Sequence, residues 1–366
     1  MALPNYGTNT TLDTLAASYQ TVAKFGEDKA WDAIAQSLEA HNRIMSSMMG
    51  ALVVRTSDRL RRYGSAARMK MVELDEFGTA DVQKIIAGVP CGFPMKLFGE
   101  TLGWTRRYFL NARSSEIAAQ FTAAQDADAI NMINQIKLAI FRATNYMFED
   151  RLVDHLQQIQ LPVKAFLNAD GAPIPVGPNG EIFDGTTHTH YFGSATLTDA
   201  FLKAVIETVL EHYRNGKPLL YINRADENAV RGLSSFIPYL QAGVRPSLTT
   251  VYSETNTLDM VDIYNRAIGT YDGAEVWVKP WMIPTYYFAT IQGQPQPIVM
   301  RVRGDYAGDG TPMDGAGELI LSFDDEAHPL RARGYEREFG MAVWNRTNGA
   351  IGNVNANGLY NVPVIQ

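Results

Sequence analysis

The chain has 366 residues, of which 46% are hydrophobic and 19% are charged, and this composition excludes global disorder because it supplies enough apolar material for a sizeable core. Its 32 basic and 39 acidic residues give a formal net charge of −7, which disfavours a general nucleic-acid-binding protein because such binding needs a dense basic surface, although a local basic face stays possible. At about 100–200 residues per domain, the length predicts two or three domains, or one large interrupted domain.

Three features of the sequence indicate the cellular compartment in which the protein is made. The sequence contains no stretch of about 18 apolar residues, so no membrane-spanning helix is predicted. The first residues lack the basic and apolar regions of a secretory signal. Cys91 is the only cysteine, which excludes an internal disulfide and any site that needs two thiolates. We therefore expect a protein that is made in a reducing cytosol.

Residues 1–62 are predicted to be helical, with breaks. Apolar residues recur at helical spacing between Leu12 and Tyr19, and a second pattern runs from Trp31 to Met45, with Asp28 as its expected N-cap. A basic cluster follows, formed by Arg55, Arg59, Arg61 and Arg62. A solvated polar face is one interpretation of this cluster, and a contact with a neighbouring subunit or an anionic ligand is the other.

A long hairpin is predicted over residues 66–87. Residues 68–74 and 81–86 form its two arms, and Gly78 permits the positive φ that the intervening turn requires. Because an isolated two-stranded ribbon is only marginally stable in water, we expect this hairpin to lie on another surface.

The strongest local signal predicts a helix over residues 116–150, with Ser114 or Ser115 as N-cap. Short strands are expected before it, at 96–100 and 104–109. Apolar residues recur every three or four positions in the helix, and no Pro or Gly interrupts it. Such a helix would be several times longer than the mean of about 11–12 residues, which is typical of a strut. A coiled coil is disfavoured because a strict heptad is missing.

The remainder predicts helices on a mixed sheet in the region 196–302. Residues 161–193 are turn-rich and predict a long irregular loop, and 304–317 predict another. The tail after Asn348 has little periodicity. Helices are expected at 196–214, 223–233 and near 258–267. Strands are expected at 218–222, 276–278, 286–290, 297–302 and 336–345.

His188 and His190 are the main candidate metal ligands. On a strand, residues i and i+2 share a face, so both imidazoles could approach one metal ion, with Asp184 nearby. A third or fourth ligand at a recognised spacing is missing, and the other four histidines show no pattern. We therefore predict no metal site and no cofactor, and interpret the pair as polar loop residues.

Other candidate chemistry is weaker. Asp305, Asp309 and Asp314 lie in a Gly-rich loop, but their spacing is not that of the helix–loop–helix calcium motif, so turn chemistry is favoured. Cys91 is interpreted as a buried, inert thiol, and the aromatic residues between 277 and 288 as core. No phosphate-binding glycine motif and no nucleophile elbow occur. We predict no catalytic residue, and no enzymatic activity.

The order of these elements carries a resemblance. A helical arm, a long hairpin and an uncommonly long helix precede an α+β region that contains the strand at 219–222, and the chain then returns through Tyr335–Asn345. The segment from Gly273 to Val302 contributes to the resemblance through its late strands. In this order the chain resembles the major capsid protein of tailed bacteriophages, whose fold is called HK97-like.

The resemblance implies an α+β, HK97-like capsid fold with five parts along the chain. These are an N-terminal arm (1–62), an extended E-loop (63–90), a P-domain with a spine helix (91–160), an A-domain with loop insertions (161–330), and a return to the P-domain with a C-terminal tail (331–366).

The implied function is self-assembly, through hexamers and pentamers, into the icosahedral shell that encloses the double-stranded DNA genome of a phage. The chain would then be made in the host cytoplasm and reside in the virion capsid. The implied partners are other copies of the chain, a scaffolding protein, a portal and a decoration protein. Packaged DNA would be bound weakly and without specificity, and no membrane partner is implied.

One branch of the family joins subunits through an isopeptide bond between an E-loop lysine and a P-domain asparagine. Lys70 and Lys84 lie in the hairpin of this chain, and Asn345, Asn348 and Asn353 lie near the return. No motif assigns any of them, so no cross-link is predicted. The short, apolar segment before the hairpin favours a separate scaffolding protein, or none.

Two alternatives stay open. The same fold would also suit an encapsulin-like compartment that houses a cargo enzyme. A different class is a soluble metal-dependent enzyme that uses His188, His190 and Asp184.

Overall fold

The computed structural model describes residues 12–64, 71, 73–74, 76–79, 88–150, 159–239, 265–304, 312, 315–325 and 330–365. The chain divides into two compact units, each built from three separate segments. Unit 1 holds residues 1–58, 94–135 and 300–340, and unit 2 holds residues 59–93, 136–299 and 341–366. Within the described part of the chain, no helix combines the length and apolar character needed to cross a membrane.

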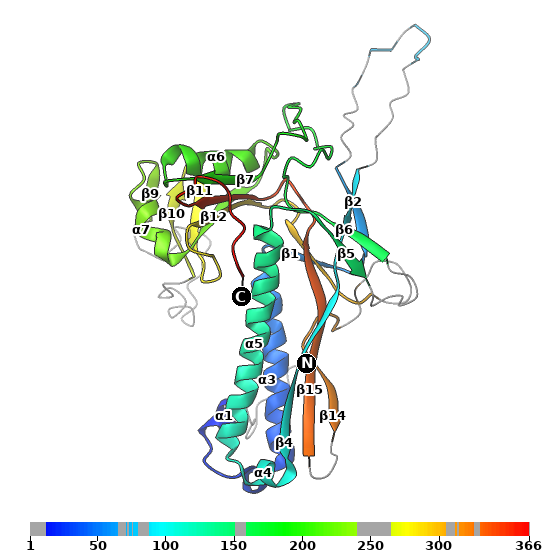
Figure 1. Ribbon diagram of the computed structural model, residues 1–366, viewed down its shortest axis with the longest axis vertical. Coiled ribbons are helices and arrows are strands. Elements are labelled where there is room, and N and C mark those ends of the chain that lie inside the picture. Colours follow the sequence, from blue (N-terminus) through cyan, green and yellow to red (C-terminus); the bar gives the residue numbers. More distant parts are fainter. Residues whose placement is uncertain are drawn as a thin grey trace. The chain divides into compact units, whose positions relative to one another are not determined.

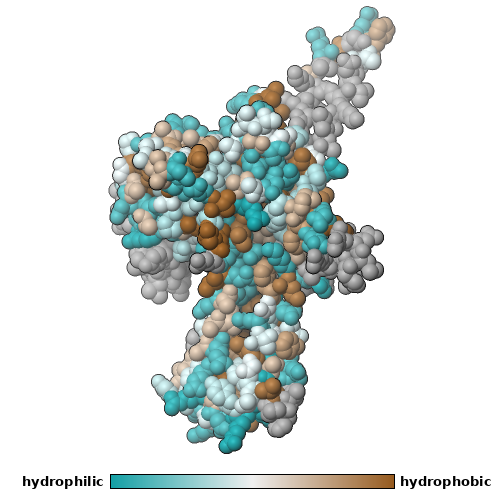
Figure 2. Space-filling model, in the orientation of Figure 1, coloured by the Kyte–Doolittle hydropathy of each residue, from teal (hydrophilic) through white to brown (hydrophobic). Residues whose placement is uncertain are grey.

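Unit 1 is organised around two long helices that lie side by side (Figure 1). Its helices are α1 (Leu12–Ala17), α2 (Val22–Phe25), α3 (Glu27–Met49), α4 (Arg106–Asn111) and α5 (Ser114–Phe141), of which the last also contributes residues to unit 2. Their apolar faces form a core around Trp104, Phe109 and Phe121. The visible face of the unit mixes hydrophilic and hydrophobic residues (Figure 2), as expected for amphipathic helices.

The predicted second helix is confirmed as α3, with one correction at its start. Gly26, rather than Asp28, occupies the N-cap position, with φ of 105°. Asp28 lies in the first turn, where its carboxylate favours the positive end of the helix dipole.

The long helix is confirmed, but it begins at Ser114, so neither Ser114 nor Ser115 is its N-cap, and it ends earlier than predicted. α5 has 28 residues, which corresponds to about 42 Å at 1.5 Å per residue. The prediction of helix up to Asp150 is wrong because Tyr146–Asp150 form strand β5, which pairs with β6 (Ile159–Val163). Periodicity along the chain could not reveal this partner strand, and the pairing overrides the helical pattern.

A five-stranded sheet has the order β1 (Val53–Thr56), β13 (Ile298–Arg301), β15 (Leu330–Val343) and β14 (Ile320–Asp325), with β4 (Lys96–Thr105) also pairing with β15. The two short strands expected at 96–100 and 104–109 are a single strand, β4, up to Thr105. The prediction is wrong for residues 106–109, because Thr105 caps α4 by accepting a hydrogen bond from the Tyr108 amide at 3.1 Å.

Unit 2 contains a seven-stranded mixed sheet, as the sequence predicted for its central part. The order is β7 (Tyr191–Ser194), β16 (Ala350–Val354), β12 (Tyr286–Gln292), β8 (Lys217–Ile222), β11 (Ala274–Val278), β10 (Arg266–Tyr271) and β9 (Phe236–Pro238). The β7–β16 and β8–β11 pairs are parallel, and the other pairs are antiparallel. β16 was not predicted, because its Gly and Asn residues show no periodicity and only burial between two strands makes it regular.

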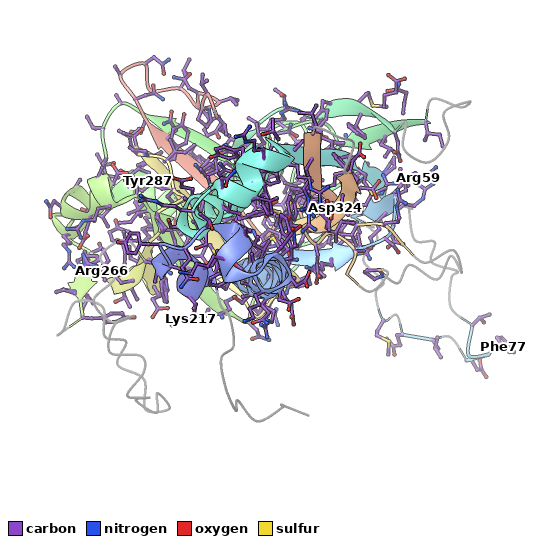
Figure 3. The ribbon with its side chains drawn as sticks, turned by 90° about the horizontal axis from the view of Figure 1, so that it is seen from below. Arg59, Phe77, Lys217, Arg266, Tyr287 and Asp324 are labelled. Carbon is purple, nitrogen blue, oxygen red and sulfur yellow. The ribbon has the colours of Figure 1, made fainter. Side chains whose placement is uncertain are left out.

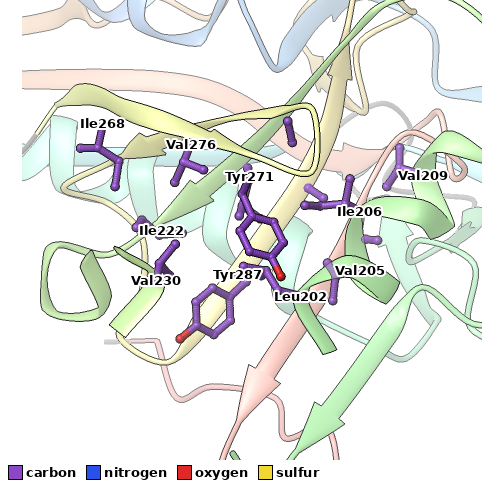
Figure 4. Packing of buried hydrophobic residues seen from close by; sticks show 14 of the residues in the cluster. Leu202, Val205, Ile206, Val209, Ile222, Val230, Ile268, Tyr271, Val276 and Tyr287 are labelled. Atoms are coloured by element: carbon purple, nitrogen blue, oxygen red, sulfur yellow. The ribbon is translucent and has the colours of Figure 1, made fainter. Parts of the chain in front are cut away.

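Helix α6 (Asp199–Leu210) packs on this sheet and forms the core of unit 2 (Figure 4). Its apolar side chains meet those of β8, β10, β11 and β12, which include Ile222, Ile268, Tyr271 and Tyr287. Thr198 caps α6 by accepting from the Phe201 amide at 3.2 Å. The expected helix is confirmed over Asp199–Leu210, but it is shorter than the predicted 196–214, because it ends at Leu210 with Glu211 as its C-cap.

The short helical segments and the aromatic residues of unit 2 agree only in part with the predictions. The short helix after β8 is confirmed as a 3₁₀ turn (Arg224–Asp226) and α7 (Glu227–Arg231). The helix near 258–267 is wrong for Arg266 and Ala267, which belong to β10, and its earlier part lies outside the described residues. Tyr286, Tyr287 and Phe288 are buried, which confirms the core interpretation of these aromatics.

The end of the N-terminal region differs from its prediction. Residues 53–56 and 60–63 are strands β1 and β2 rather than helix, and β2 (Leu60–Tyr63) pairs with β3 (Val89–Gly92). Most of both arms of the predicted hairpin between these two strands lies outside the described residues. The turn is confirmed at Gly78, which has φ of 73°.

Candidate functional site

The described residues of the predicted hairpin expose apolar side chains. Met71, Leu74 and Phe77 are all exposed, and Phe77 retains 90% of its accessible surface (Figure 3). An exposed group of large apolar residues is a common sign of an interaction surface. We call these three residues the hairpin tip.

A second exposed apolar group belongs to unit 1. Strand β14 is the last strand of the five-stranded sheet, and all six of its residues are exposed. Ile320, Leu321 and Phe323 are its large apolar residues. An edge strand presents backbone donors and acceptors that another chain can pair with. We call β14 the exposed edge strand.

A buried ion pair holds the framework of unit 1 together. The Arg337 guanidinium on β15 is 1% exposed and binds the Asp128 carboxylate on α5 through Nε at 2.8 Å and Nη2 at 2.7 Å. Arg337 also donates to the Gly317 carbonyl at 2.7 Å and to Asn42 Oδ1 on α3 at 3.0 Å. His41 Nε2 lies 2.7 Å from Asp128 Oδ2. One guanidinium thus connects α3, α5 and β15.

A second buried arginine organises the irregular segment after β6. The Arg346 guanidinium is fully buried and donates to the Ala165 carbonyl at 2.7 Å and to Asn168 Oδ1 at 2.9 Å. Its Nη2 lies 3.2 Å from Asp170 Oδ2. A loop without its own backbone ladder must satisfy its carbonyls elsewhere, and Arg346 supplies these donors.

The electrostatics of Asp170 follow from this contact. Burial alone would raise the pKa of Asp170, but a hydrogen bond from Lys164, the charge of Arg346 and a hydrogen bond from Asn145 outweigh it and hold the pKa well below its usual range. Asp170 therefore remains a carboxylate at neutral pH and stabilises the buried guanidinium.

Three imidazoles and one carboxylate converge in unit 2. His188 and His190 lie in the loop that leads into β7, and Glu211 and His212 directly follow α6. The Nε2 atoms of His188 and His190 are 3.2 Å apart, and each lies 3.1 Å from Nε2 of His212. Glu211 Oε1 lies 3.4 Å from His188 Nε2 and 3.9 Å from His212 Nε2. We call these four residues the histidine cluster.

The backbone positions His190 firmly. Its amide donates to the Leu167 carbonyl at 2.7 Å, and its carbonyl accepts from the Ile351 amide of β16 at 2.8 Å. The imidazole Nδ1 lies 2.7 Å from the Gly349 carbonyl. Because a carbonyl only accepts, Nδ1 carries the hydrogen, and Nε2 presents its lone pair to the other two imidazoles.

Burial keeps the imidazoles neutral. It lowers the pKa of His190 well below its usual range, and the neighbouring imidazoles lower it further. Burial also lowers the pKa of His212 to about 3 and lowers that of His188. For Glu211, burial and then the charges of Glu181 and Glu207 raise the pKa to about 7.

The structure changes the set of residues around the two predicted histidines. Asp184 is not part of the histidine cluster, because its carboxylate binds Thr186 and Thr187 in its own turn. The sequence missed His212, which follows His190 by 22 residues and comes close only because α6 packs on the sheet. The available signal was a Glu-His pair at the end of an amphipathic helix, which is weak by itself.

The remaining candidates fall in three groups. Cys91 is buried, as predicted, and burial raises its pKa to about 11. The candidate cross-link asparagines are also buried, and each is hydrogen bonded within unit 2; they are Asn345, Asn348 and Asn353. Five further candidates lie outside the described residues: Lys70, Lys84, Asp305, Asp309 and Asp314.

The arginine cluster at 55–62 is distributed over separate contacts. Arg55 donates to Ser46 Oγ at 2.7 Å, and Arg62 donates to the Gly88 carbonyl at 3.3 Å. Arg59 lies 3.4 Å from the buried Asp150 carboxylate, and Arg61 lies over the ring of Trp344. These contacts within the chain account for much of the cluster.

Comparisons with known proteins concern the fold. No protein-family model and no curated protein sequence matches the chain. Among solved structures, one from Mycobacterium phage Patience matches with a TM-score of 0.65 and 18% identity, covering 99% of this chain and 97% of that chain.

Two further structures are similar at lower scores. The cyanophage A-1(L) capsid asymmetric unit has a TM-score of 0.47 and 10% identity, covering 84% of this chain and 92% of that chain. The capsid of a native GTA particle has a TM-score of 0.46 and 13% identity, covering 85% and 90%. Because both scores lie below 0.5, only the phage Patience match bears on the fold. The match spans nearly the whole of both chains, so this chain shares the α+β fold of that phage structure, in agreement with the HK97-like fold that its sequence resembles.

Proposed function

We propose that this chain is a major capsid protein, which assembles into the icosahedral shell around the double-stranded DNA genome of a tailed phage. The observation that carries the proposal is the match over nearly the whole chain to a structure from a phage. This match agrees with the resemblance to tailed-phage capsid proteins that the order of elements in the sequence indicated. In this role the chain acts through repeated self-contact and needs no catalytic site.

Two exposed surfaces support self-contact. The hairpin tip presents Met71, Leu74 and Phe77, and the exposed edge strand presents Ile320, Leu321 and Phe323. Both groups would cost free energy in an isolated chain in water, and a neighbouring copy that covers them would recover it. The edge strand can in addition pair its backbone with a strand of a neighbour.

The parts of the chain are then assigned by this role. We assign the N-terminal arm to 1–62, the E-loop to 63–90, the P-domain to 91–160, the A-domain to 161–330 and the return to 331–366. Helix α5 would brace the P-domain, because the backbone hydrogen bonds between its two ends lie within the helix. The partners would be a scaffolding protein, a portal and a decoration protein, and the net charge of −7 suits an inner face that holds DNA only weakly.

Electron microscopy of the expressed chain tests the proposal. We expect hollow particles with icosahedral symmetry, formed by the chain alone or together with a scaffolding protein from the same genome. A chain that stays monomeric under all of these conditions would contradict the proposal. Closed particles that package a protein cargo rather than DNA in the native host would instead identify an encapsulin-like compartment.

A variant of the hairpin tip tests its role in assembly. Replacing Phe77 with serine is expected to leave the fold unchanged and to weaken the contacts between subunits by about 2 kcal/mol each, because buried aromatic residues dominate interfaces. Particle yield, measured by sedimentation, should therefore fall sharply. Ile182→Ser is the matched control, since Ile182 is 89% exposed and lies outside both surfaces. Equal yields from the two variants would remove the hairpin tip from the assembly contacts.

A further inference from the structure

The histidine cluster has the dimensions of a metal site. In a tetrahedral zinc site with Zn–N distances of about 2.0–2.1 Å, neighbouring ligand nitrogens are separated by about 3.3–3.4 Å. The three Nε2 atoms are separated by 3.1–3.2 Å, close to that value. The Glu211 carboxylate oxygen lies 3.4 Å from His188 Nε2, on the scale of a fourth ligand.

Hydrogen bonding between the imidazoles does not explain this arrangement. The Nδ1 hydrogen of His190 is donated to the Gly349 carbonyl, so its Nε2 has only a lone pair. If His188 and His212 both carried hydrogens on Nε2, these hydrogens would face each other. If only one did, two lone pairs would still face each other at close range. One shared cation satisfies all three lone pairs.

The surroundings resemble those of known ligands in metal sites. A ligating histidine usually donates its other ring N–H to a carbonyl or a carboxylate, and His190 does so to Gly349. The Phe183 ring lies against the imidazoles of His188 and His212, with centroid distances of 4.9 and 4.4 Å, and gives the cluster an apolar wall. His190 is fully buried, so bulk water does not solvate its lone pair.

We infer that the histidine cluster is a structural zinc site, with His188, His190, His212 and Glu211 as its ligands. The sequence had predicted no metal site. Imidazole and carboxylate ligands in tetrahedral geometry favour zinc among the divalent metals. Four protein ligands would close the coordination sphere, which is typical of a structural rather than a catalytic site. The ion would join the loop before β7 to the end of α6.

The consequence for the fold is a cross-link within unit 2. The loop between β6 and β7 has no helix or strand among its described residues, and the Arg346 side chain is one of the groups that hold it. Metal binding to the folded state stabilises that state by mass action. The inference goes beyond the proposed function, because it concerns a single subunit and holds whether or not shells form.

Zinc content of the full-length chain tests the inference. The purified protein is equilibrated with zinc chloride, dialysed against metal-free buffer and measured by inductively coupled plasma mass spectrometry. We expect one zinc ion per chain. Cobalt(II) in place of zinc should produce the visible absorption of a four-coordinate ion. A folded chain that retains no zinc and shows no such absorption overturns the inference.

Variants identify the ligands. His188→Ala is chosen because its side chain is the most exposed of the three, at 17%, so that the fold tolerates its loss. Zinc affinity should fall by more than about 100-fold, since losing outer-shell partners alone costs about 10–100-fold. Glu211→Gln should retain zinc more weakly, with an altered cobalt spectrum. His155→Ala is the control, because it removes a histidine but none of the four ligands.

A second measurement covers variants that fold poorly. Zinc should raise the melting temperature of the wild-type chain, and a chelator should reverse this rise. The zinc site would be contradicted if His188→Ala bound zinc with the affinity of the wild-type chain. It would also be contradicted if zinc did not change the melting temperature of the wild-type chain. Shell formation by the same preparations is scored separately, so that failure to assemble and failure to bind zinc are told apart.

Discussion

Replacing Arg337 with methionine is expected to lower the free energy of unfolding by about 3–5 kcal/mol, because the substitution leaves the buried Asp128 carboxylate without its guanidinium and with His41 as its neighbour. Arg337 forms four hydrogen bonds at 2.7–3.0 Å, two of them to Asp128, and its side chain is buried. The Gly317 carbonyl and Asn42 lose a donor as well. Urea unfolding of the unassembled chain measures the loss.

Arg303→Met is the matched control. Arg303 lies 2.8 Å from Glu338, but its side chain is 56% exposed, so solvent screens the pair and its loss should cost no more than about 1 kcal/mol. The double variant Arg337→Met with Asp128→Leu should recover part of the stability, since no charge then remains buried alone. Equal losses for Arg337→Met and Arg303→Met would show that burial does not determine the cost.

Arg346→Met is expected to destabilise unit 2 by about 2–5 kcal/mol, because each buried acceptor that loses its donor costs about 1–3 kcal/mol. The guanidinium is fully buried and serves the Ala165 carbonyl, Asn168 and Asp170. Removing it leaves the buried Ala165 carbonyl and Asn168 Oδ1 without this donor, and Asp170 keeps Lys164, whose Nζ lies 2.9 Å from its carboxylate, as a neighbouring cation. The loss should appear as faster amide hydrogen exchange in residues 165–170, measured by mass spectrometry, and as a lower urea midpoint.

Arg214→Met provides the comparison for this loop. Arg214 also anchors the irregular region, through Asn179 Oδ1 at 2.8 Å, but it is exposed. Its replacement should cost less than about 1 kcal/mol, because water can satisfy the groups that it leaves. Unchanged hydrogen exchange at 165–170 in Arg346→Met would mean that the loop is held by other contacts.

The two arginines show what the sequence could not predict. Neither stands out in composition or spacing, and each is one of many charged residues. Arg337 meets Asp128 over a separation of 209 residues, and Arg346 meets Ala165 over 181. Burial of a guanidinium depends on partners that only the folded chain brings together, so no local pattern indicates it.

Local chemistry, by contrast, predicted most of the elements that depend on neighbours in the chain. The α3 and α6 helices follow from apolar residues at helical spacing, and the turn at Gly78 follows from the backbone freedom of glycine. The errors lie where pairing decided the outcome. Residues 146–150 became β5 because β6 lay beside them, and 350–354 became β16 between two strands.

By itself, the sequence determined the α+β class, the long helix and the resemblance to a shell protein, because these follow from periodicity and from the order of elements. Only the tertiary structure decided which side chains meet. The histidine cluster illustrates this: the His188 and His190 pair was visible in the sequence, whereas His212 and Glu211 joined it through the packing of α6 on the sheet. Spacing along a chain specifies local geometry, and convergence of distant residues requires the whole fold.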